Sequence, residues 1–282
     1  MWRLAVDLPD LVTVDRAAAA LDEQCEALSA FENGVGWRLE GLSRVRPNQA
    51  LLEAALSLVA PAATVILERV PARDWVGENQ AGFPPLRAGR FFIFGSHYRG
   101  AVPRAAIPIV IDAATAFGTG EHATTRGCLL AMDLPVRRPR AVLDMGCGTG
   151  ILAIAAAKRW RRQVLACDID REAVRVTSIN ARRNQVARSI RAGMASGYAR
   201  RSIARRAPFD LVFANILARP LIAMAPDLAR VLRSGGIAIL SGLLSRQAPA
   251  VLAAHRAQGL YLVSRIALEG WHTLVVTKRD IR

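Results

Sequence analysis

The stretch A-V-L-D-M-G-C-G-T-G, residues 141–150, decides the fold of this chain. Its apolar start ends at Asp144, as a strand buried on both faces does. Gly146, Gly148 and Gly150 follow, and an apolar helical pattern begins directly after them. Because glycine adopts positive φ and carries no Cβ, such a turn lets a ligand approach the backbone closely. The stretch therefore predicts a strand, a ligand-binding turn and a helix in immediate succession.

The same alternation of strand and helix continues on the C-terminal side of this stretch. We expect strands at 141–145, 163–168, 209–214 and 236–241, separated by helices at 150–160, 171–184 and 219–233. Strands that alternate with helices form a mostly parallel sheet covered on both faces. The predicted fold class is therefore α/β and Rossmann-like.

The first 70 residues show a different pattern. They predict strands at 2–8, 37–42 and 62–70, a helix that follows Asp15 and continues through Leu28, and a second helix that begins at Pro47. We therefore expect a small α+β domain at 1–70, a connector at 71–110 that is rich in Gly and Pro at its start, and the main domain at 111–282. Within the connector, 91–94 and 106–112 look like strands.

The composition leaves the nature of a charged partner open. The formal net charge is +15, which suggests a polyanion such as nucleic acid. Of the 38 basic residues, however, only Lys158 and Lys278 are lysines, and arginine doublets are scattered through the second half. The same bias follows from the codon usage of a GC-rich genome, so the charge alone does not identify a partner.

Cysteine usage and hydropathy indicate the compartment. The four cysteines lie far apart, without a C-x-x-C pair or a histidine at ligand spacing, so we expect neither a disulfide framework nor a bound metal. Asp7 and Asp10 stand where a secretory signal would be apolar, and no window of about 18 residues is uninterruptedly apolar. We expect a cytoplasmic protein without membrane contact.

The spacing of the glycines indicates which cofactor the loop takes. A dinucleotide fingerprint reads G-x-G-x-x-G, whereas residues 144–150 read D-x-G-x-G-x-G, the pattern typical of class I S-adenosylmethionine (SAM) methyltransferases. Asp168 ends the next predicted strand, where its carboxylate can accept hydrogen bonds from both ribose hydroxyls. Asp170 is the expected cap of the following helix. We therefore predict that Gly146, Gly148, Gly150 and Asp168 bind SAM.

A second segment, A-T-A-F-G-T-G-E-H-A-T-T at residues 114–125, precedes the glycine loop. Its glycines loosen the backbone before a helix that begins near Glu121, with Thr119 as a cap. Such a loop can fold over the cofactor and bring a helix N-terminus and hydroxyls to its carboxylate. Phe117, Thr119 and Thr125 are therefore predicted to contact SAM, although Phe117 also fits a core position and threonines also satisfy backbone groups.

A third segment, F-D-L-V-F-A-N-I-L-A-R-P at residues 209–220, ends an apolar strand in an amide. Asn215 lies at the carboxyl end of its strand, where α/β sheets bind ligands. Its side-chain oxygen, with the carbonyls of Ile216 and Leu217, can accept hydrogen bonds from an amine. Enzymes that methylate planar bases commonly carry N-P-P-Y here, but Leu217 and Ala218 supply no ring, which favours an aliphatic amine. The alternative is that Asn215 simply terminates the strand.

Together, these motifs make the chain recognisable. F-G-T-G-E-H-A-T-T, D-M-G-C-G-T-G-I-L-A-I-A-A, D-I-D, N-I-L-A-R-P-L, L-S-G-L-L and E-G-W-H-T-L, in this order, resemble the PrmA family, the methyltransferases of ribosomal protein L11. The resemblance covers residues 74–282. It implies a class I SAM methyltransferase fold with a small N-terminal domain that recognises the substrate.

The resemblance also implies an activity and roles for particular residues. It implies methylation of lysine side-chain and N-terminal amines on a ribosomal protein, SAM contacts at Thr125 and Gly146, ribose binding at Asp168 and a methyl-transfer site at Asn215. The high positive charge adds a weak contact with ribosomal RNA as an expectation. Two alternatives stay open: an RNA or DNA methyltransferase, and a non-catalytic ribosome-associated binding protein with the same fold.

Overall fold

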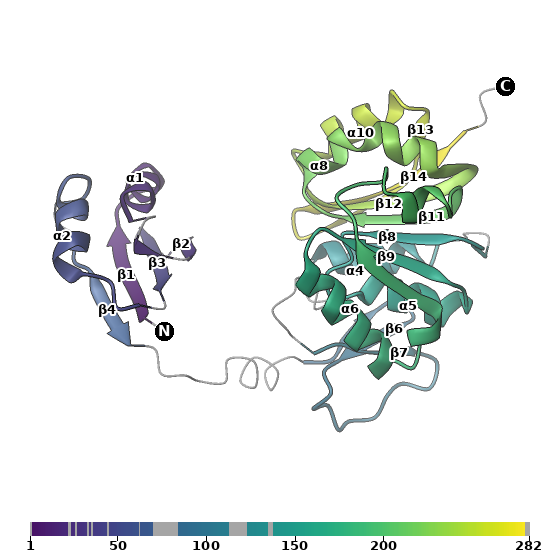
Figure 1. The fold of residues 1–282 in the computed structure, drawn as a ribbon, viewed down its shortest axis with the longest axis horizontal. Coiled ribbons are helices and arrows are strands. Elements are labelled where there is room, and N and C mark those ends of the chain that lie inside the picture. The colour runs from purple at the N-terminus through teal and green to yellow at the C-terminus, as the bar shows by residue number, and fades with distance from the viewer. Residues whose placement is uncertain are drawn as a thin grey trace. The chain divides into compact units, whose positions relative to one another are not determined.

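The computed structural model describes residues 2–21, 24–25, 27–32, 34, 36–43, 45–61, 63–69, 84–112, 123–134 and 138–279. The chain forms two compact units, Met1–Trp75 and Val76–Arg282 (Figure 1), and each is described by itself. The finer division into 1–70, 71–110 and 111–282 stays a prediction. None of the helices in the described ranges is long and apolar enough to cross a membrane.

The described residues of the N-terminal unit form an antiparallel sheet with two helices. Its strands follow the order β2-β3-β1-β4 and are β1 Trp2–Leu8, β2 Ala27–Glu32, β3 Trp37–Ser43 and β4 Ile66–Arg69. The helices α1 Leu11–Leu21 and α2 Gln49–Ser57 bury apolar side chains such as Leu21, Leu52 and Leu56 with Leu4 and Val6 of β1. This small core makes the unit compact on its own.

The two helices of this unit differ from the prediction. The helix expected to continue through Leu28 ends at Leu21, and the residues beyond it form β2, paired with β3. The spacing of apolar residues fits both structures, and pairing with β3 decides between them. The helix begins at Leu11, before Asp15 and not after it, and Asp10 caps it, because the Asp10 Oδ1 accepts from the Thr13 N–H at 2.7 Å. In α2 the N-cap is Asn48 rather than a helical Pro47.

The C-terminal unit contains the predicted parallel sheet. A seven-stranded sheet has the order β10-β9-β8-β11-β12-β14-β13, in which only the pairs that involve β14 are antiparallel. Its strands are β8 Val142–Met145, β9 Val164–Asp168, β10 Ile190–Met194, β11 Phe209–Asn215, β12 Leu232–Leu244, β13 Leu260–Leu268 and β14 Trp271–Lys278. A smaller sheet joins β5 Leu86–Ala88, β6 Phe91–Phe94 and β7 Ile107–Val110.

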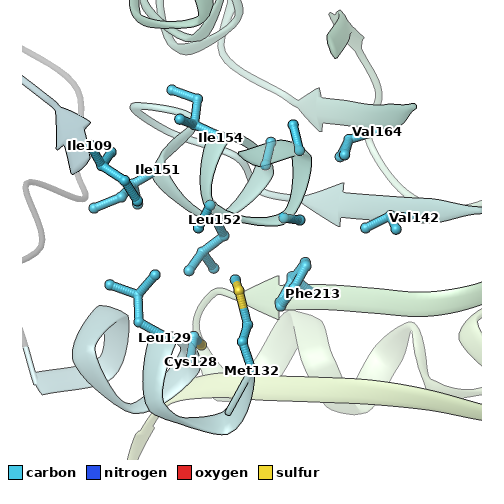
Figure 2. Packing of buried hydrophobic residues seen from close by; sticks show 14 of the residues in the cluster. Ile109, Cys128, Leu129, Met132, Val142, Ile151, Leu152, Ile154, Val164 and Phe213 are labelled. Carbon is cyan, nitrogen blue, oxygen red and sulfur yellow. The ribbon is translucent and has the colours of Figure 1, made fainter. Parts of the chain in front are cut away.

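Side-chain alternation along the strands produces two cores, one on each face of the sheet. In β11, Leu211 and Phe213 join one cluster, whereas Val212 and Ala214 join the other. Figure 2 shows Phe213 together with Leu129 and Leu152 in the first cluster. Helices α4 Ala123–Ala131 and α5 Ile151–Trp160 pack in this cluster, and α8 Ala218–Ala223, α9 Ala225–Val231 and α10 Ala248–Arg256 pack in the second. The other helical segments among the described residues of this unit are α6 Arg171–Arg183, η2 Ala187–Ser189 and α7 Arg201–Ala204.

Three features of this unit were not anticipated from the sequence. Strand β10 and the short helix α7 after it were missed, as were helix α10 and the strands β13 and β14, which extend the sheet beyond β12. The single helix expected at 219–233 is divided at Met224 into α8 and α9. Pro226 explains the break, because its ring nitrogen has no hydrogen to bond to the carbonyl four residues earlier.

Candidate active site

A cavity of about 480 Å³ opens at the carboxyl ends of β8, β9 and β11, the edge at which parallel sheets bind ligands. Its size is within the usual range for sites that bind small molecules. Most of the predicted site residues with described positions line it. The lining comprises Thr125, Met145, Gly146, Cys147, Gly148, Ile151, Leu152, Asp168, Ile169, Ser196, Gly197, Asn215, Ile216, Leu217, Pro220 and Met224.

The glycine loop has the backbone conformation that its sequence predicts. Gly146, Gly148 and Gly150 have φ values of +75°, +52° and +80°, which L-residues with a side chain rarely adopt. A Cβ at Gly146 would also lie 2.2 Å from Cγ2 of Ile216. Glycine is therefore required at Gly146 for two reasons, the positive φ and the close approach of Ile216. Gly150, which was also predicted to bind the cofactor, does not line the cavity.

Helix α6 holds the glycine loop from behind through buried polar side chains. The Thr177 hydroxyl donates to the carbonyl of Gly148 at 2.9 Å, and the Asn180 amide donates to the carbonyl of Thr149 at 2.9 Å. Thr177 and Asn180 are three residues apart, so they lie on one face of the helix. Two successive carbonyls of the loop are therefore fixed, and their peptide groups keep one orientation towards the cavity.

Asp168 connects the loop to the end of β9. Its Oδ2 accepts from the N–H of Gly148 at 2.9 Å, and its Oδ1 accepts from the N–H of Asp170 at 3.0 Å. Each carboxylate oxygen has further acceptor capacity, and the residue lines the cavity. Asp170 caps α6 as predicted, since its side chain accepts from the N–H of Glu172. The two neighbouring carboxylates therefore have different tasks.

Asp144 lies beneath the loop and is fully buried. Its Oδ2 accepts from the N–H of Ala153 at 3.0 Å, whereas Oδ1 has no hydrogen-bond partner among the residues that the structure describes. Burial raises the pKa of this carboxyl to about 7, the Ala153 hydrogen bond opposes the shift, and the negative charge of Asp168 adds to it. From the sequence, Asp144 was the end of a strand and the first residue of the D-x-G-x-G-x-G pattern, with no role of its own.

Asn215 and Thr125 meet inside the cavity. The Asn215 amide nitrogen donates to the Thr125 hydroxyl at 3.3 Å, and both residues line the cavity. The Oδ1 atom of Asn215 is buried and has no partner within the described ranges. A buried acceptor without a partner is uncommon in proteins and costs free energy. The site therefore presents one acceptor that is ready to bind a donor on a ligand.

Helix α4 is held close to the sheet, which brings Thr125 to this position. The buried hydroxyls of Ser241 and Thr273 are 2.8 Å apart, and Ser241 also donates to the carbonyl of Thr124 at 3.2 Å. A Cβ at Gly127 would lie 2.2 Å from the hydroxyl oxygen of Thr273. Only glycine permits this approach, so Gly127 and Ser241 support Thr125 from outside the cavity.

The residues after Asn215 show which main-chain acceptors border the site. The carbonyl of Ile216 lies beside Gly242, where an added Cβ would be 2.3 Å from the oxygen. The carbonyl of Leu217 accepts from the N–H of Leu221 and so begins α8. The Leu217 side chain is 72% exposed. These residues place no aromatic ring on the rim of the cavity.

Some residues fall outside the prediction or outside the described part of the chain. Phe117 and Thr119 lie in the segment 113–122, which the structure does not describe, so their contacts stay predictions. Ser196 and Gly197 line the cavity and were missed, because they follow β10, the strand that was also missed. In the described ranges, no three His, Cys, Asp or Glu side chains gather as metal ligands would. The expectation of no metal likewise stays a prediction.

Comparison with known proteins places this architecture in a family. Residues 42–279 match the family model described as ribosomal protein L11 methyltransferase (PrmA). The ribosomal protein L11 methyltransferase of Bradyrhizobium diazoefficiens is 46% identical over 271 residues, which cover 94% of this chain and 92% of the relative. That of Rhodopseudomonas palustris is 44% identical over 273 residues, with the same two shares.

A solved structure agrees with these sequence matches. The crystal structure of ribosomal protein L11 methylase from Lactobacillus delbrueckii subsp. bulgaricus superposes with a TM-score of 0.64 at 29% identity, and the match covers 70% of this chain and all of the other. The predicted class I methyltransferase fold, with a mostly parallel sheet and a small N-terminal α+β part, is confirmed. The chain belongs to the ribosomal protein L11 methyltransferase (PrmA) family.

Proposed function

We propose that this chain transfers methyl groups from SAM to amino groups of ribosomal protein L11, at lysine side chains and at the N-terminal amine. Family membership and the names of its relatives support the protein substrate. The Oδ1 of Asn215 supports the chemistry, because it is buried in the cavity, has no partner among the described residues and is an acceptor suited to the N–H of an amine. This atom is the observation on which the proposal mainly rests.

The residues of the cavity fit SAM. Asp168 offers acceptor capacity for the two ribose hydroxyls, and the loop at Gly146 leaves the backbone uncovered by a side chain. Met145, Ile151 and Leu152 add an apolar wall on which the uncharged parts of the cofactor can pack. Asp168 and the loop would hold the cofactor at one end of the cavity, and Thr125 and Asn215 would border its reacting end.

When bound, SAM supplies a methyl group on a positively charged sulfur, and transfer of this methyl requires a neutral nucleophile in line with the carbon–sulfur bond. At its reference pKa of about 10.4, a lysine amine is neutral only to the order of 0.1% near pH 7. The apolar cavity favours the neutral amine by desolvation. Asn215 would accept one N–H and thereby direct the lone pair of the nitrogen.

The rim of the cavity favours an aliphatic amine over a nucleobase. A base taken out of its stack is usually held against an aromatic ring. After Asn215 the chain offers the exposed side chain of Leu217 and the buried Ala218. Neither can stack on a planar ring, so RNA and DNA are the less favoured substrates. The N-terminal unit would recognise the protein substrate, and the cytoplasm is the compartment we propose for the reaction.

The test is to incubate the purified protein with methyl-labelled SAM and, separately, with L11, with the remaining ribosomal proteins and with ribosomal RNA. We expect label on L11, at lysine and N-terminal amines identified by mass spectrometry, and a loss of labelling in Asn215→Ala. The matched control is Asp170→Ala, which alters a neighbouring helix cap outside the cavity and should label L11 normally. Label on RNA, or on non-amine groups of L11, would contradict the proposal.

A further inference from the structure

A second cavity, of about 560 Å³, opens at the opposite edge of the large sheet, by the amino ends of β8, β9, β11 and β12. We call it the arginine pocket. Its lining includes Arg138, Arg140, Arg162, Arg233 and Asp210 and the segment Ser234–Gly236. The candidate active site lies at the carboxyl ends of these strands, so the two sites occupy opposite edges of one sheet.

The positive charge of the pocket is only partly compensated within it. Asp210 is the one acidic residue in the lining. Its Oδ2 accepts from the backbone N–H groups of Arg140 and Ala141, both at 2.8 Å, and its Oδ1 pairs with Arg233 Nε at 3.0 Å. Within the described ranges, Arg138 donates only to the uncharged carbonyl of Trp160. The lining therefore has four arginines and one aspartate, so three guanidinium charges are not neutralised by a carboxylate of the lining.

Arg162 supplies a separate indication of a ligand. Its Nε is buried and has no hydrogen-bond partner in the described part of the chain. Among the same residues, neither Arg162 nor Arg140 forms an ion pair. A buried donor without an acceptor costs free energy, and a guanidinium keeps its charge at any ordinary pH. Both facts are explained if an anion with several acceptor oxygens enters the pocket.

The backbone beside the arginines leaves room for such an anion. Residues 233–236 bulge out of the pairing between β11 and β12, where Phe209 pairs with Leu232 and Leu211 pairs with Ile237. Gly235 has a φ of +71°, and a Cβ built on it would meet no heavy atom within 4 Å. Phosphate matches the fork of a guanidinium, to which it can bond through two oxygens. The open space beside Gly235 and the surrounding arginines therefore suit a phosphate group.

Positive charge continues along this edge beyond the pocket. Arg191 lies in β10 one residue after its amino end, and Arg206 lies shortly before β11. Burial, and then the positive charge of Arg191, lower the pKa of Arg206, so these two cations lie within electrostatic range. Arg279 follows the end of β14, which meets the start of β13 at the same edge. A row of cations that extends beyond the reach of a single phosphate group suits a polyanion.

We propose that this edge of the sheet binds the phosphodiester backbone of RNA, with one phosphate seated in the arginine pocket. The binding is independent of base sequence, because it uses guanidinium groups and main-chain atoms. It leaves the cavity at Asn215 and Asp168 accessible, since that cavity opens at the other edge. The protein could thus hold RNA and a protein substrate at once.

The test is fluorescence anisotropy with a labelled single-stranded RNA of mixed sequence, measured over a series of salt concentrations. The double variant Arg140→Ala/Arg162→Ala should bind about tenfold or more weakly at low salt, and the slope of log K against log salt should fall in magnitude by about 1.4, or about 0.7 for each lost contact. The matched control Arg104→Ala/Arg246→Ala removes the same charge at two exposed positions outside the pocket. It should leave most of the affinity intact.

Three results would overturn the proposal. The first is an equal loss in both double variants, because the binding would then come from charge spread over the whole surface. The second is that inorganic phosphate titrates the pocket while RNA affinity does not respond to the pocket variant, which would identify a free small anion as the occupant. The third is equal binding of poly-glutamate, which would remove the preference for phosphate. Calorimetry with SAM checks that the pocket variant is folded, since its affinity for SAM should be unchanged.

Discussion

The side-chain amide of Asn215 donates a hydrogen bond to the hydroxyl of Thr125, although the two residues are 90 positions apart in the chain. This bond engages the amide nitrogen and leaves Oδ1 as an acceptor with no partner in the part of the chain that the structure describes. Helix α4 and strand β11 must both be in place for it to form. The orientation of Asn215 is therefore a property of the packed fold, and the first two predictions start from this arrangement.

Replacing Asn215 with alanine should separate binding from turnover. The variant keeps Asp168 and the glycine loop, so its affinity for SAM in calorimetry should stay within a few-fold of the wild type. Its kcat for methylation of L11 should fall by about 10²–10³, the usual effect of removing one oriented polar group from an active site. An unchanged kcat would mean that Asn215 only terminates its strand.

Thr125 should act through Asn215, and a pair of variants tests this dependence. Thr125→Ser keeps the hydroxyl and should retain most activity, whereas Thr125→Val keeps the shape, loses the hydrogen bond and should lower kcat about tenfold, or about 1.4 kcal/mol. In the Asn215→Ala background, Thr125→Val should have no further effect on kcat. Additive losses in the double variant would show that Thr125 contributes independently of Asn215.

Asp168→Ala should abolish the binding of SAM. The substitution removes acceptors for the cofactor and also frees the N–H of Gly148, so the loop loses an anchor. Asp170→Ala is the control, because Asp170 caps α6 and does not line the cavity. It should cost about 1 kcal/mol of unfolding free energy and leave the affinity for SAM unchanged. Near-normal affinity in Asp168→Ala would refute the assignment of Asp168 to the cofactor.

Features that depend on a local pattern of residues could be predicted from the sequence, whereas features that depend on which strands pair could not. The glycine loop, Asp168 and Asn215 were identified because strand ends and glycines leave a signature in a few consecutive residues. Strand β10 was missed because I-R-A-G-M is only five residues long, has an arginine and a glycine within it, and forms one edge of the large sheet. Ser196 and Gly197 were missed together with β10, because they reach the cavity only through the parallel pairing of β10 with β9.

The supporting contacts of the site were also beyond the reach of the sequence. Gly127 is an ordinary helix residue until Thr273, far along the chain, is seen to lie where its side chain would be. The raised pKa of Asp144 depends on complete burial and on the distance to Asp168, and neither can be derived from spacing along the chain. Packing between distant segments determines such properties.

Gly146→Ala should weaken both folding and SAM binding. The backbone at Gly146 has a φ of +75°, and the new Cβ would collide with Ile216, so the loop or Ile216 must move. We expect the free energy of unfolding to fall by about 1 kcal/mol or more, and the affinity for SAM to fall at least about tenfold. Gly193→Ala is the matched control, since its Cβ would meet nothing within 4 Å. Equal behaviour of the two variants in denaturant unfolding and calorimetry would contradict the prediction.

Asp144 should make the stability of the protein depend on pH in a defined window. Its pKa is raised from 3.8 to about 7 in the folded state, chiefly by burial, so between these values the folded carboxyl is protonated and the unfolded one is ionised. Unfolding then releases a proton, and stability falls as pH rises from about 4 to about 7, by at most about 1.4 kcal/mol per pH unit. Above about 7 both states are ionised and this dependence ends.

The variant Asp144→Asn isolates this effect, because it keeps the acceptor for the N–H of Ala153 and cannot ionise. We expect its unfolding free energy, relative to the wild type, to increase between pH 5 and pH 7 and to level off at higher pH in denaturant titrations. An infrared band of a protonated, buried carboxyl should be present in the wild type at pH 6 and absent in the variant. If the difference in unfolding free energy between variant and wild type were the same at every pH, the prediction would be wrong, because Asp144 would then be ionised in the folded protein over the whole range.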